Sequence, residues 1–170
     1  MKQEHQKYKQ LHNNQNRIKY SQIPRSLLLT DIENLALGTT DGSLATRQFD
    51  RFLEAAKFKP GDLGYIASNK ALWKCLAWHV RRKSYCQYVV SGREQDGADR
   101  ALLDRARSLD LSTLDRLVIG SGDGIFAEIA YDAGQAGLST IVVANSGSVA
   151  GHLRYFADEV VELVPPLSRS

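Results

Sequence analysis

The stretch SLLLTDIENLALG, residues 26–38, decides the fold, because its three consecutive leucines are followed, after Thr30, by Asp31, with Asn34 three residues later. A short apolar run without polar alternation is typical of a strand that is covered on both faces. In parallel α/β sheets, ligands bind beyond the carboxyl ends of the strands. We therefore expect a central strand whose carboxyl end delivers Asp31 to a ligand crevice.

Five further apolar runs follow the same pattern. They span residues 63–68, 85–91, 116–121, 140–145 and 159–164. Between them, apolar residues recur at helical spacing, as at Phe49, Phe52, Leu53 and Ala56, which predicts helices with one buried stripe. Alternating strands and helices predict an α/β fold, a three-layer sandwich with a mainly parallel central sheet and helices on both faces.

Two helix ends can also be predicted. Gly137 stands where the helix from about residue 124 should stop, as a C-terminal cap. Ser146 or Ser148 is a candidate N-cap for the helix that follows.

Composition indicates an ordinary globular protein. Of the 170 residues, 43% are hydrophobic and 24% are charged, and no apolar run approaches the roughly 18 residues that a membrane helix needs. Two cysteines, Cys75 and Cys86, without a Cys-x-x-Cys motif, argue against a disulfide framework or a cysteine-based zinc site. We expect a cytoplasmic protein with no membrane association.

Charge separates an N-terminal segment from the rest of the chain. Residues 1–25 carry a local charge of +5 and few large apolar side chains, while the rest of the chain carries −2. This composition predicts a flexible basic N-terminal arm over 1–25, which is either a disordered extension or an arm that contacts nucleic acid. A single domain over 26–165 and a short tail over 166–170 complete the predicted organisation.

Acidic residues follow the other strands as well. Asp96, Asp99 and Asp104 come after the run at 85–91, and Asp123 follows the run at 116–121. Carboxylates gathered in one crevice repel one another unless a cation neutralises them, and oxygen ligands suit Mg²⁺ or Mn²⁺. Such ions activate water and stabilise the charge that develops during phosphodiester hydrolysis.

Each of these acids also has a structural explanation. Asp96 or Asp99 would cap the helix near 99–109, and Asp123 the helix near 124–136. A cap is less expected at Asp31, because ENLALGTT does not continue as a clear helix. Two polar neighbours are candidate supporting residues, each with an alternative role in a turn or cap: Asn34 to orient water or ligand, and Ser121 to orient Asp123.

Three segments together give the chain a family resemblance. They are LLLTDIENLA (27–36), DGADRALLDRA (96–106) and DRLVIGSGDGIFAEIAYDAGQAGLSTIVVA (115–144). In this order they resemble the NYN domain group, PIN-like ribonucleases related to the LabA proteins. The resemblance covers most of residues 26–165. It implies a PIN-like fold, a divalent metal and hydrolysis of RNA.

By matching positions, the resemblance assigns the site residues. It implies catalytic roles for Asp31, Asn34, Asp99 and Asp123, metal ligation by the three aspartates, and a second nearby acid at Asp104. One position departs from the family pattern. The family often has an acid two residues after the aspartate of the Ser-Gly-Asp turn, and this chain has Ile125. Glu128 is a candidate replacement, with a solvated helix face as its alternative.

A dinucleotide-binding pattern competes with this interpretation. Gly122-x-Gly124-x-x-Ala127 follows a strand and precedes a helix. That fingerprint normally lies on the first strand, and an acid should end the next strand, where this chain has Asn145. We therefore expect no nicotinamide or flavin cofactor, and we interpret the glycines as allowing Asp123 to turn sharply into the cleft.

Basic residues suggest where RNA would lie. In NKALWKCLAWHVRRKSY (69–85), the side chains of Lys70, Lys74 and Arg81 share one helical face beside Trp78, which suits a phosphate backbone and a stacked base. The alternative is a solvated face. Two further candidates flank the acidic turn, Arg93 and Arg100, which would either hold substrate or balance the charge of the acids.

The sequence thus predicts a metal-dependent endoribonuclease that uses Mg²⁺ or Mn²⁺. The alternative is an RNA-binding or regulatory module with the same fold and a weakened site, as the loss of an acid at Ile125 would allow. Assembly into a homo-oligomer stays open.

Overall fold

The computed structural model describes residues 25–83, 86–90 and 97–164. Most of the predicted N-terminal arm and the predicted C-terminal tail lie outside these ranges. Within the described residues, six strands form one sheet in which all neighbours are parallel, in the order β3-β2-β1-β4-β5-β6. The strands are Ser26–Asp31 (β1), Leu63–Ser68 (β2), Cys86–Val90 (β3), Arg116–Gly120 (β4), Ser139–Asn145 (β5) and Glu159–Leu163 (β6). All six predicted strands are confirmed.

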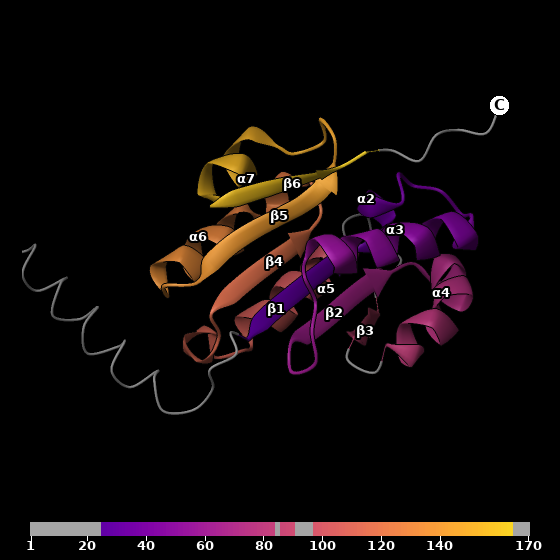
Figure 1. Cartoon of the computed structure of the whole chain (residues 1–170), viewed down its shortest axis with the longest axis horizontal. Coiled ribbons are helices and arrows are strands. Elements are labelled where there is room, and N and C mark those ends of the chain that lie inside the picture. Colours follow the sequence, from indigo (N-terminus) through magenta and orange to yellow (C-terminus); the bar gives the residue numbers. More distant parts are fainter. Residues whose placement is uncertain (1–24, 84–85, 91–96, 165–170) are drawn as a thin grey trace, which may run out of the picture.

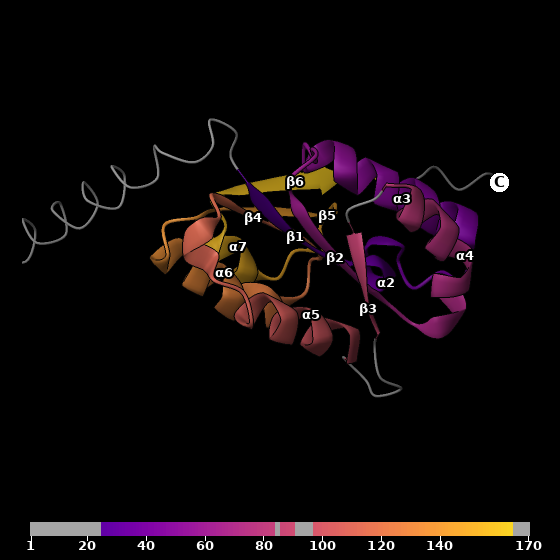
Figure 2. The same ribbon diagram turned by 90° about the horizontal axis from the view of Figure 1, so that it is seen from below.

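Helices cover both faces of this sheet, as predicted. They are Ile32–Leu35 (α2), Gly42–Ala55 (α3), Lys70–Arg82 (α4), Gly97–Arg107 (α5), Ala127–Gln135 (α6) and Gly151–Phe156 (α7), with short 3₁₀ helices at Leu111–Thr113 (η1) and Gly124–Phe126 (η2). Seen along the sheet, α5, α6 and α7 lie on one side and α2, α3 and α4 on the other (Figure 2). The three-layer α/β sandwich is therefore confirmed. None of the helices formed by the described residues is long and apolar enough to cross a lipid bilayer.

The leucines of β1 explain why this strand shows no polar alternation. Leu27 and Leu29 belong to the core under α5 and α6, whereas Leu28 belongs to the core under α3 and α4. All three are fully buried. A strand buried on both faces needs apolar side chains at every position, so β1 occupies the centre of the molecule.

The strand order places the topological switch point of the sheet beside β1. The chain runs outward from β1 through β2 to β3, and α5 then carries it back across the sheet to β4, on the other side of β1 (Figure 1). Neighbouring connections therefore diverge between β1 and β4, which is the switch point where open α/β sheets bind ligands. The helix α5 packs against β1, β2 and β3, and Asp99 in its first turn interacts with Asp31 at the carboxyl end of β1.

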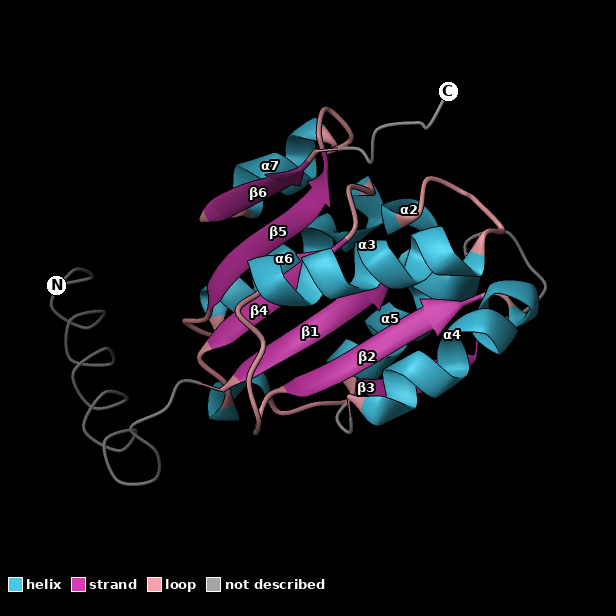
Figure 3. Ribbon diagram, turned by 45° about the vertical axis from the view of Figure 1, so that its right-hand side comes forward, coloured by secondary structure: helices cyan, strands magenta, loops and turns pink. Residues whose placement is uncertain are grey.

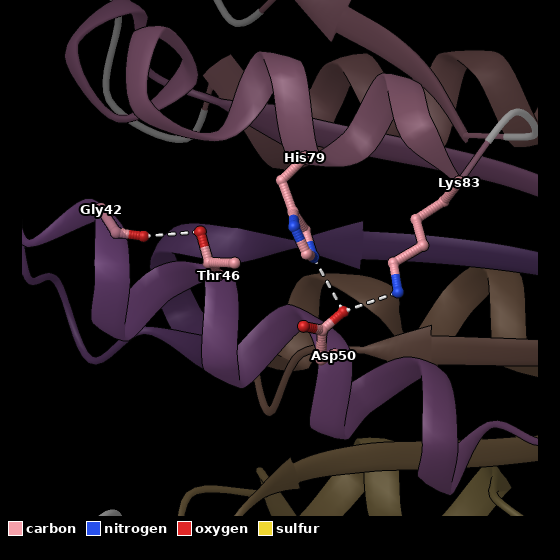
Figure 4. A network of polar contacts seen from close by, with 5 residues as sticks. All are labelled: Gly42, Thr46, Asp50, His79 and Lys83. Atoms are coloured by element: carbon pink, nitrogen blue, oxygen red, sulfur yellow. Dashed lines mark hydrogen bonds and ion pairs between the residues drawn. The ribbon is translucent and has the colours of Figure 1, made fainter.

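The helices α3 and α4 pack closely beside this core. A Cβ atom added at Gly42 would lie 2.3 Å from Cys75 Cβ, so only glycine permits this helix contact. Further along the pair, one carboxylate oxygen of Asp50 contacts His79 Nε2 at 2.9 Å and Lys83 Nζ at 3.1 Å (Figure 4). The two contacts join the helices near the end of α4.

The predicted C-terminal cap at Gly137 is confirmed, whereas the predicted N-cap at Ser146 or Ser148 is wrong. Gly137 follows α6 with a φ of +84°, as a C-terminal glycine cap requires. Neither Ser146 nor Ser148 caps α7, which begins at Gly151 after Ala150 and has no side-chain cap. Their hydroxyls donate instead to Glu162 Oε2 and Asn145 O, so both serines stabilise the loop that precedes the helix.

Candidate active site

Asp31 ends β1 at the carboxyl edge of the sheet and also caps a helix. Its side chain, which is 5% exposed, accepts a hydrogen bond from Asn34 N at 3.2 Å and so caps the one-turn helix α2. A cap was less expected at Asp31 than at the other acids, yet Asp31 does cap a helix, because IENL forms a helical turn too short for sequence periodicity to show. One carboxylate oxygen caps this turn, and the other points toward β4.

Asp99 meets Asp31 at this edge. It lies in the first turn of α5, is 8% exposed, and its side chain is in hydrogen-bonding contact with the Asp31 carboxylate. Burial raises the pKa of the Asp31 carboxyl above its ordinary value, and the nearby Glu33 adds to this rise. Hydrogen bonds from Asn34, Asp99 and Ser121 oppose it. Two buried carboxyls in contact hold a proton between them or need a cation.

Ser121 and Asn34 join this pair to the turn after β4. Ser121 Oγ lies 3.3 Å from Asp31 Oδ2 and accepts a hydrogen bond from Asp123 N at 3.2 Å. Asn34 Oδ1 accepts a hydrogen bond from Gly122 N at 3.0 Å. Both predicted supporting residues therefore contact the acidic site, and Ser121 orients Asp31 through its hydroxyl and Asp123 through its backbone.

The glycines of the same turn have a different role from the predicted one. Neither Gly122 nor Gly124 has a positive φ. A Cβ at Gly122 would lie 2.5 Å from Ser148 O, and one at Gly124 would lie 2.1 Å from the ring of His152. The glycines are needed because the chain after β5 packs directly on this turn.

Asp123 lies beside the pair but not within it. Its side chain is exposed, and its Oδ1 accepts a hydrogen bond from Ile125 N at 3.0 Å, which caps η2. Throughout the described ranges, no group of three or more His, Cys, Asp or Glu side chains has a geometry that would hold a metal ion. The structure thus brings Asp31 and Asp99 together and leaves Asp123 as a neighbouring cap.

The remaining predicted acids and arginines are on the surface or outside the described residues. Asp104 and Arg100 are exposed on α5. Glu128 is exposed and pairs with Arg107 at 2.9 Å, so its carboxylate is engaged between α5 and α6. Asp96 and Arg93 lie outside the described residues.

The predicted basic face of α4 is exposed along its length. The predicted residues, Lys70, Lys74, Trp78 and Arg81, are all exposed, and so is the adjacent Arg82; we call these five residues the α4 basic face. The Arg82 guanidinium lies 4.6 Å from the centre of the Trp78 ring, which is 68% exposed. Glu33 Oε1 accepts a hydrogen bond from Asn69 N at 2.6 Å, so the start of α4 is tied to α2. The helix α4 therefore begins near α2, which Asp31 caps, and lies beside β2 (Figure 3).

Sequence reasoning missed two buried amides beside the site, Asn145 and Gln48. They are 2% and 1% exposed and hydrogen bond to each other at 3.2 Å across 97 residues of chain. Asn145 was considered only as an argument against a dinucleotide site. The sequence signal for Asn145 is that a polar residue ends the otherwise apolar run at 140–145.

Comparisons with known proteins show a fold and no family. No family model matches the chain, and no curated protein matches it. A crystal structure of a protein of unknown function from Vibrio parahaemolyticus is similar, with a TM-score of 0.58 and 15% sequence identity, over 85% of this chain and 96% of that one. At this identity the likeness extends to the arrangement of strands and helices alone.

Proposed function

We propose that the protein is a metal-dependent ribonuclease whose site is built on Asp31 and Asp99. The single observation that carries this proposal is the contact between two buried carboxyls at the carboxyl end of the central strand, beside the β1–β4 switch point. Burying two carboxyl groups together lowers the stability of a fold, because desolvation and mutual repulsion disfavour their charged forms. Such a cost is typical of functional sites.

The oxygen atoms present fit Mg²⁺ or Mn²⁺ in one particular way. Mg²⁺ is commonly held by one or two carboxylates while keeping several waters and contacting substrate phosphates. Asp31 and Asp99 supply two such carboxylates, and Asp123 could add only the oxygen that does not cap η2. The fit is therefore to an open, hydrated ion held by a carboxylate pair, and not to a closed cage of three acids.

Each protein residue then has a defined task. The metal, when bound, supplies charge stabilisation to the phosphodiester and lowers the pKa of water. Asp31 and Asp99 would hold it, Ser121 fixes the orientation of the Asp31 carboxylate, and Asn34 ties α2 to the turn after β4. The Ser121 hydroxyl, the Asn34 amide and the fixed backbone of the turn keep the donors in place before substrate arrives.

A second candidate is an RNA-binding module with the same fold and little cleavage. It is favoured by the absence of a three-acid group among the described residues and by Ile125 at the position where related nucleases often have an acid. In that case the carboxyl pair would hold a shared proton at low pH and bind metal weakly.

The two candidates differ in one measurement. We expect the wild-type chain to cut end-labelled RNA in the presence of Mn²⁺, because the carboxylate pair then holds the ion, and to stop when EDTA is added. The products are resolved on a denaturing gel. If RNA is retained intact with Mn²⁺ present while a gel shift shows binding, the module is correct and the nuclease is not.

The α4 basic face would bind the RNA strand. We expect Trp78→Ala to weaken binding of single-stranded RNA by about tenfold, since a base stacked on an aromatic ring contributes ~1–3 kcal/mol. The residue is largely exposed, so the free energy of unfolding should change little. Binding is measured by fluorescence anisotropy in EDTA, which prevents cleavage.

The control for this prediction is Tyr155→Ala. Tyr155 is 81% exposed on α7, on the other side of the sheet (Figure 2), and its loss should leave RNA affinity unchanged. Lys74→Gln should reduce the salt dependence of binding, since each lost phosphate contact lowers that slope. Equal weakening by Tyr155→Ala and Trp78→Ala would show that exposed aromatic rings in general, and not the α4 basic face, bind the strand.

A further inference from the structure

The helix α2 contains one site residue, Asn34, is capped by another, Asp31, and is too short to be stable alone. It contains four residues, Ile32–Leu35, whereas isolated helices below about 12 residues are marginal in water. Its C-terminal carbonyls also need hydrogen-bond donors: Leu37 N donates to Asn34 O at 3.1 Å, and the other donors to Asn34 O and Leu35 O come from side chains. The orientation of Asn34, and of the Asp31 carboxylate that caps the helix, therefore depends on what holds these carbonyls.

Two buried amides supply the donors. Asn145 Nδ2 donates to Asn34 O at 3.1 Å and to Leu35 O at 3.0 Å. Gln48 Nε2 donates to Leu35 O and to Asn145 Oδ1, both at 3.2 Å. Arg51 Nη1 donates to Gln48 Oε1 at 2.9 Å, which fixes the orientation of that amide. We call Asn145 and Gln48 the amide clamp.

The clamp joins three parts of the fold. Asn145 ends β5, Gln48 lies on α3, and the carbonyls they hold belong to α2. Beyond the clamp, Asn34 Oδ1 accepts from Gly122 N, and Asn34 N donates to Asp31 Oδ1. A continuous chain of hydrogen bonds thus runs from β5 and α3 to the acidic pair.

Because the amide clamp is buried, its two positions require polar side chains. A donor left unpaired inside the protein costs the full desolvation penalty of that group, and both donors of Asn145 and the oxygen of each amide are used here. Apolar side chains at these two positions would fill the space and leave the two carbonyls without these partners. This explains why polar residues end β5 and face α2 in an otherwise apolar layer.

We propose that Asn145 and Gln48 are positioning residues, which hold α2 so that Asn34 and Asp31 keep the geometry needed for metal binding. They act through α2 and contact neither metal nor substrate. The metal part of this inference rests on the proposed function, while the control of α2 does not. The experiment below separates the two.

The test uses amide hydrogen exchange of the full chain by NMR. In Asn145→Ala, exchange of the Gly122 amide, which donates to Asn34, should accelerate by about tenfold relative to the wild type, as expected for loss of one or two hydrogen bonds. The Ala150 amide, which donates to Gly122 O at 2.9 Å, serves as the internal reference. Gln48→Met should show a smaller effect in the same direction and replaces Asn145→Ala if that variant does not fold.

A matched control lies at the opposite edge of the sheet. Asp62 is 4% exposed, and its carboxylate accepts from Ser26 N and Lys59 N, at 2.8 and 3.1 Å. Asp62→Asn should destabilise the whole fold, and it should accelerate exchange of the Gly122 amide no more than exchange of the Ala150 amide. Titration with Mn²⁺, followed by water proton relaxation, should then show about tenfold weaker binding in Asn145→Ala, the usual loss for a residue that orients a metal ligand, and no change in Asp62→Asn.

The outcomes decide each claim separately. An unchanged ratio of Gly122 to Ala150 exchange in both clamp variants overturns the inference, and so does Mn²⁺ affinity equal to that of Asp62→Asn. If the wild type binds no Mn²⁺, the exchange ratio alone decides. Selective acceleration at Gly122 in a chain that cuts no RNA supports the clamp and removes the nuclease proposal.

Discussion

Asp31→Asn should lose more than about a hundredfold of its RNA cleavage rate, because replacing a ligand costs more than the ~10–100-fold that loss of a residue orienting a ligand costs. Asn is isosteric, and its oxygen can still accept from Asn34 N and so cap α2. The change therefore removes charge and leaves the turn in place. Cleavage is measured as single-turnover rates at saturating Mn²⁺.

The same substitution should stabilise the metal-free protein at neutral pH. Burial raises the pKa of the Asp31 carboxyl above 3.8, so in the range above that value the folded chain retains a proton that the unfolded chain has released. Wild-type stability therefore falls as the pH rises through this range until the raised pKa is passed. Asn does not titrate. In EDTA, the melting temperature of Asp31→Asn should exceed that of the wild type at pH 7, and the difference should shrink toward pH 4.

Adding Mn²⁺ should reverse this order, because an ion that binds only the folded wild type stabilises it by mass action. Asp104→Asn, an exposed acid on α5, is the matched control and should keep both cleavage and stability. If Asp31→Asn cuts RNA as well as Asp104→Asn does, the acidic pair is not the catalytic centre.

Gly120→Ala should be the most destabilising of the conservative changes considered. A Cβ at this position in β4 would lie 2.7 Å from Cε2 of Phe52, a residue of α3 whose ring is fully buried. Overpacking of this kind costs about 1–3 kcal/mol, which lowers the melting temperature of a chain this size by about 2–12 °C. Thermal and urea unfolding followed by circular dichroism measure the change.

Gly134→Ala is the control for this prediction. Gly134 lies inside α6, and an added Cβ would meet nothing within 4 Å, so alanine should raise the free energy of unfolding by about 0.5–1 kcal/mol through helix propensity. Phe52→Leu should cost less in the Gly120→Ala background than alone, because the smaller side chain makes room. Additive effects of the two changes would contradict the proposed contact.

The sequence predicted local structure well, and contacts between distant segments less well. Strands such as β1 were evident because burial on both faces leaves an uninterrupted apolar run. The one-turn helix α2 was not, since four residues show no helical period. Topology predicts that Asp31 and Asp99 lie at the same edge of the sheet. The carboxylate of Asp123 accepts a hydrogen bond from Ile125 N instead, and this local contact is not determined by strand order.

The amide clamp shows a second limit. Asn145 and Gln48 meet across 97 residues, and nothing near either residue indicates the partner. Buried polar residues in apolar segments mark such contacts without identifying them.

The return of α5 across the sheet has a further consequence. Asp31 belongs to the half of the sheet formed by β3, β2 and β1, whereas Ser121 follows β4 in the other half, and Asp99 lies on the helix that connects them. Neither half of the polypeptide contains the whole site. An ion or substrate bound there would contact both halves of the polypeptide. Its binding would therefore stabilise the association of the two halves, and separation of the halves would release it.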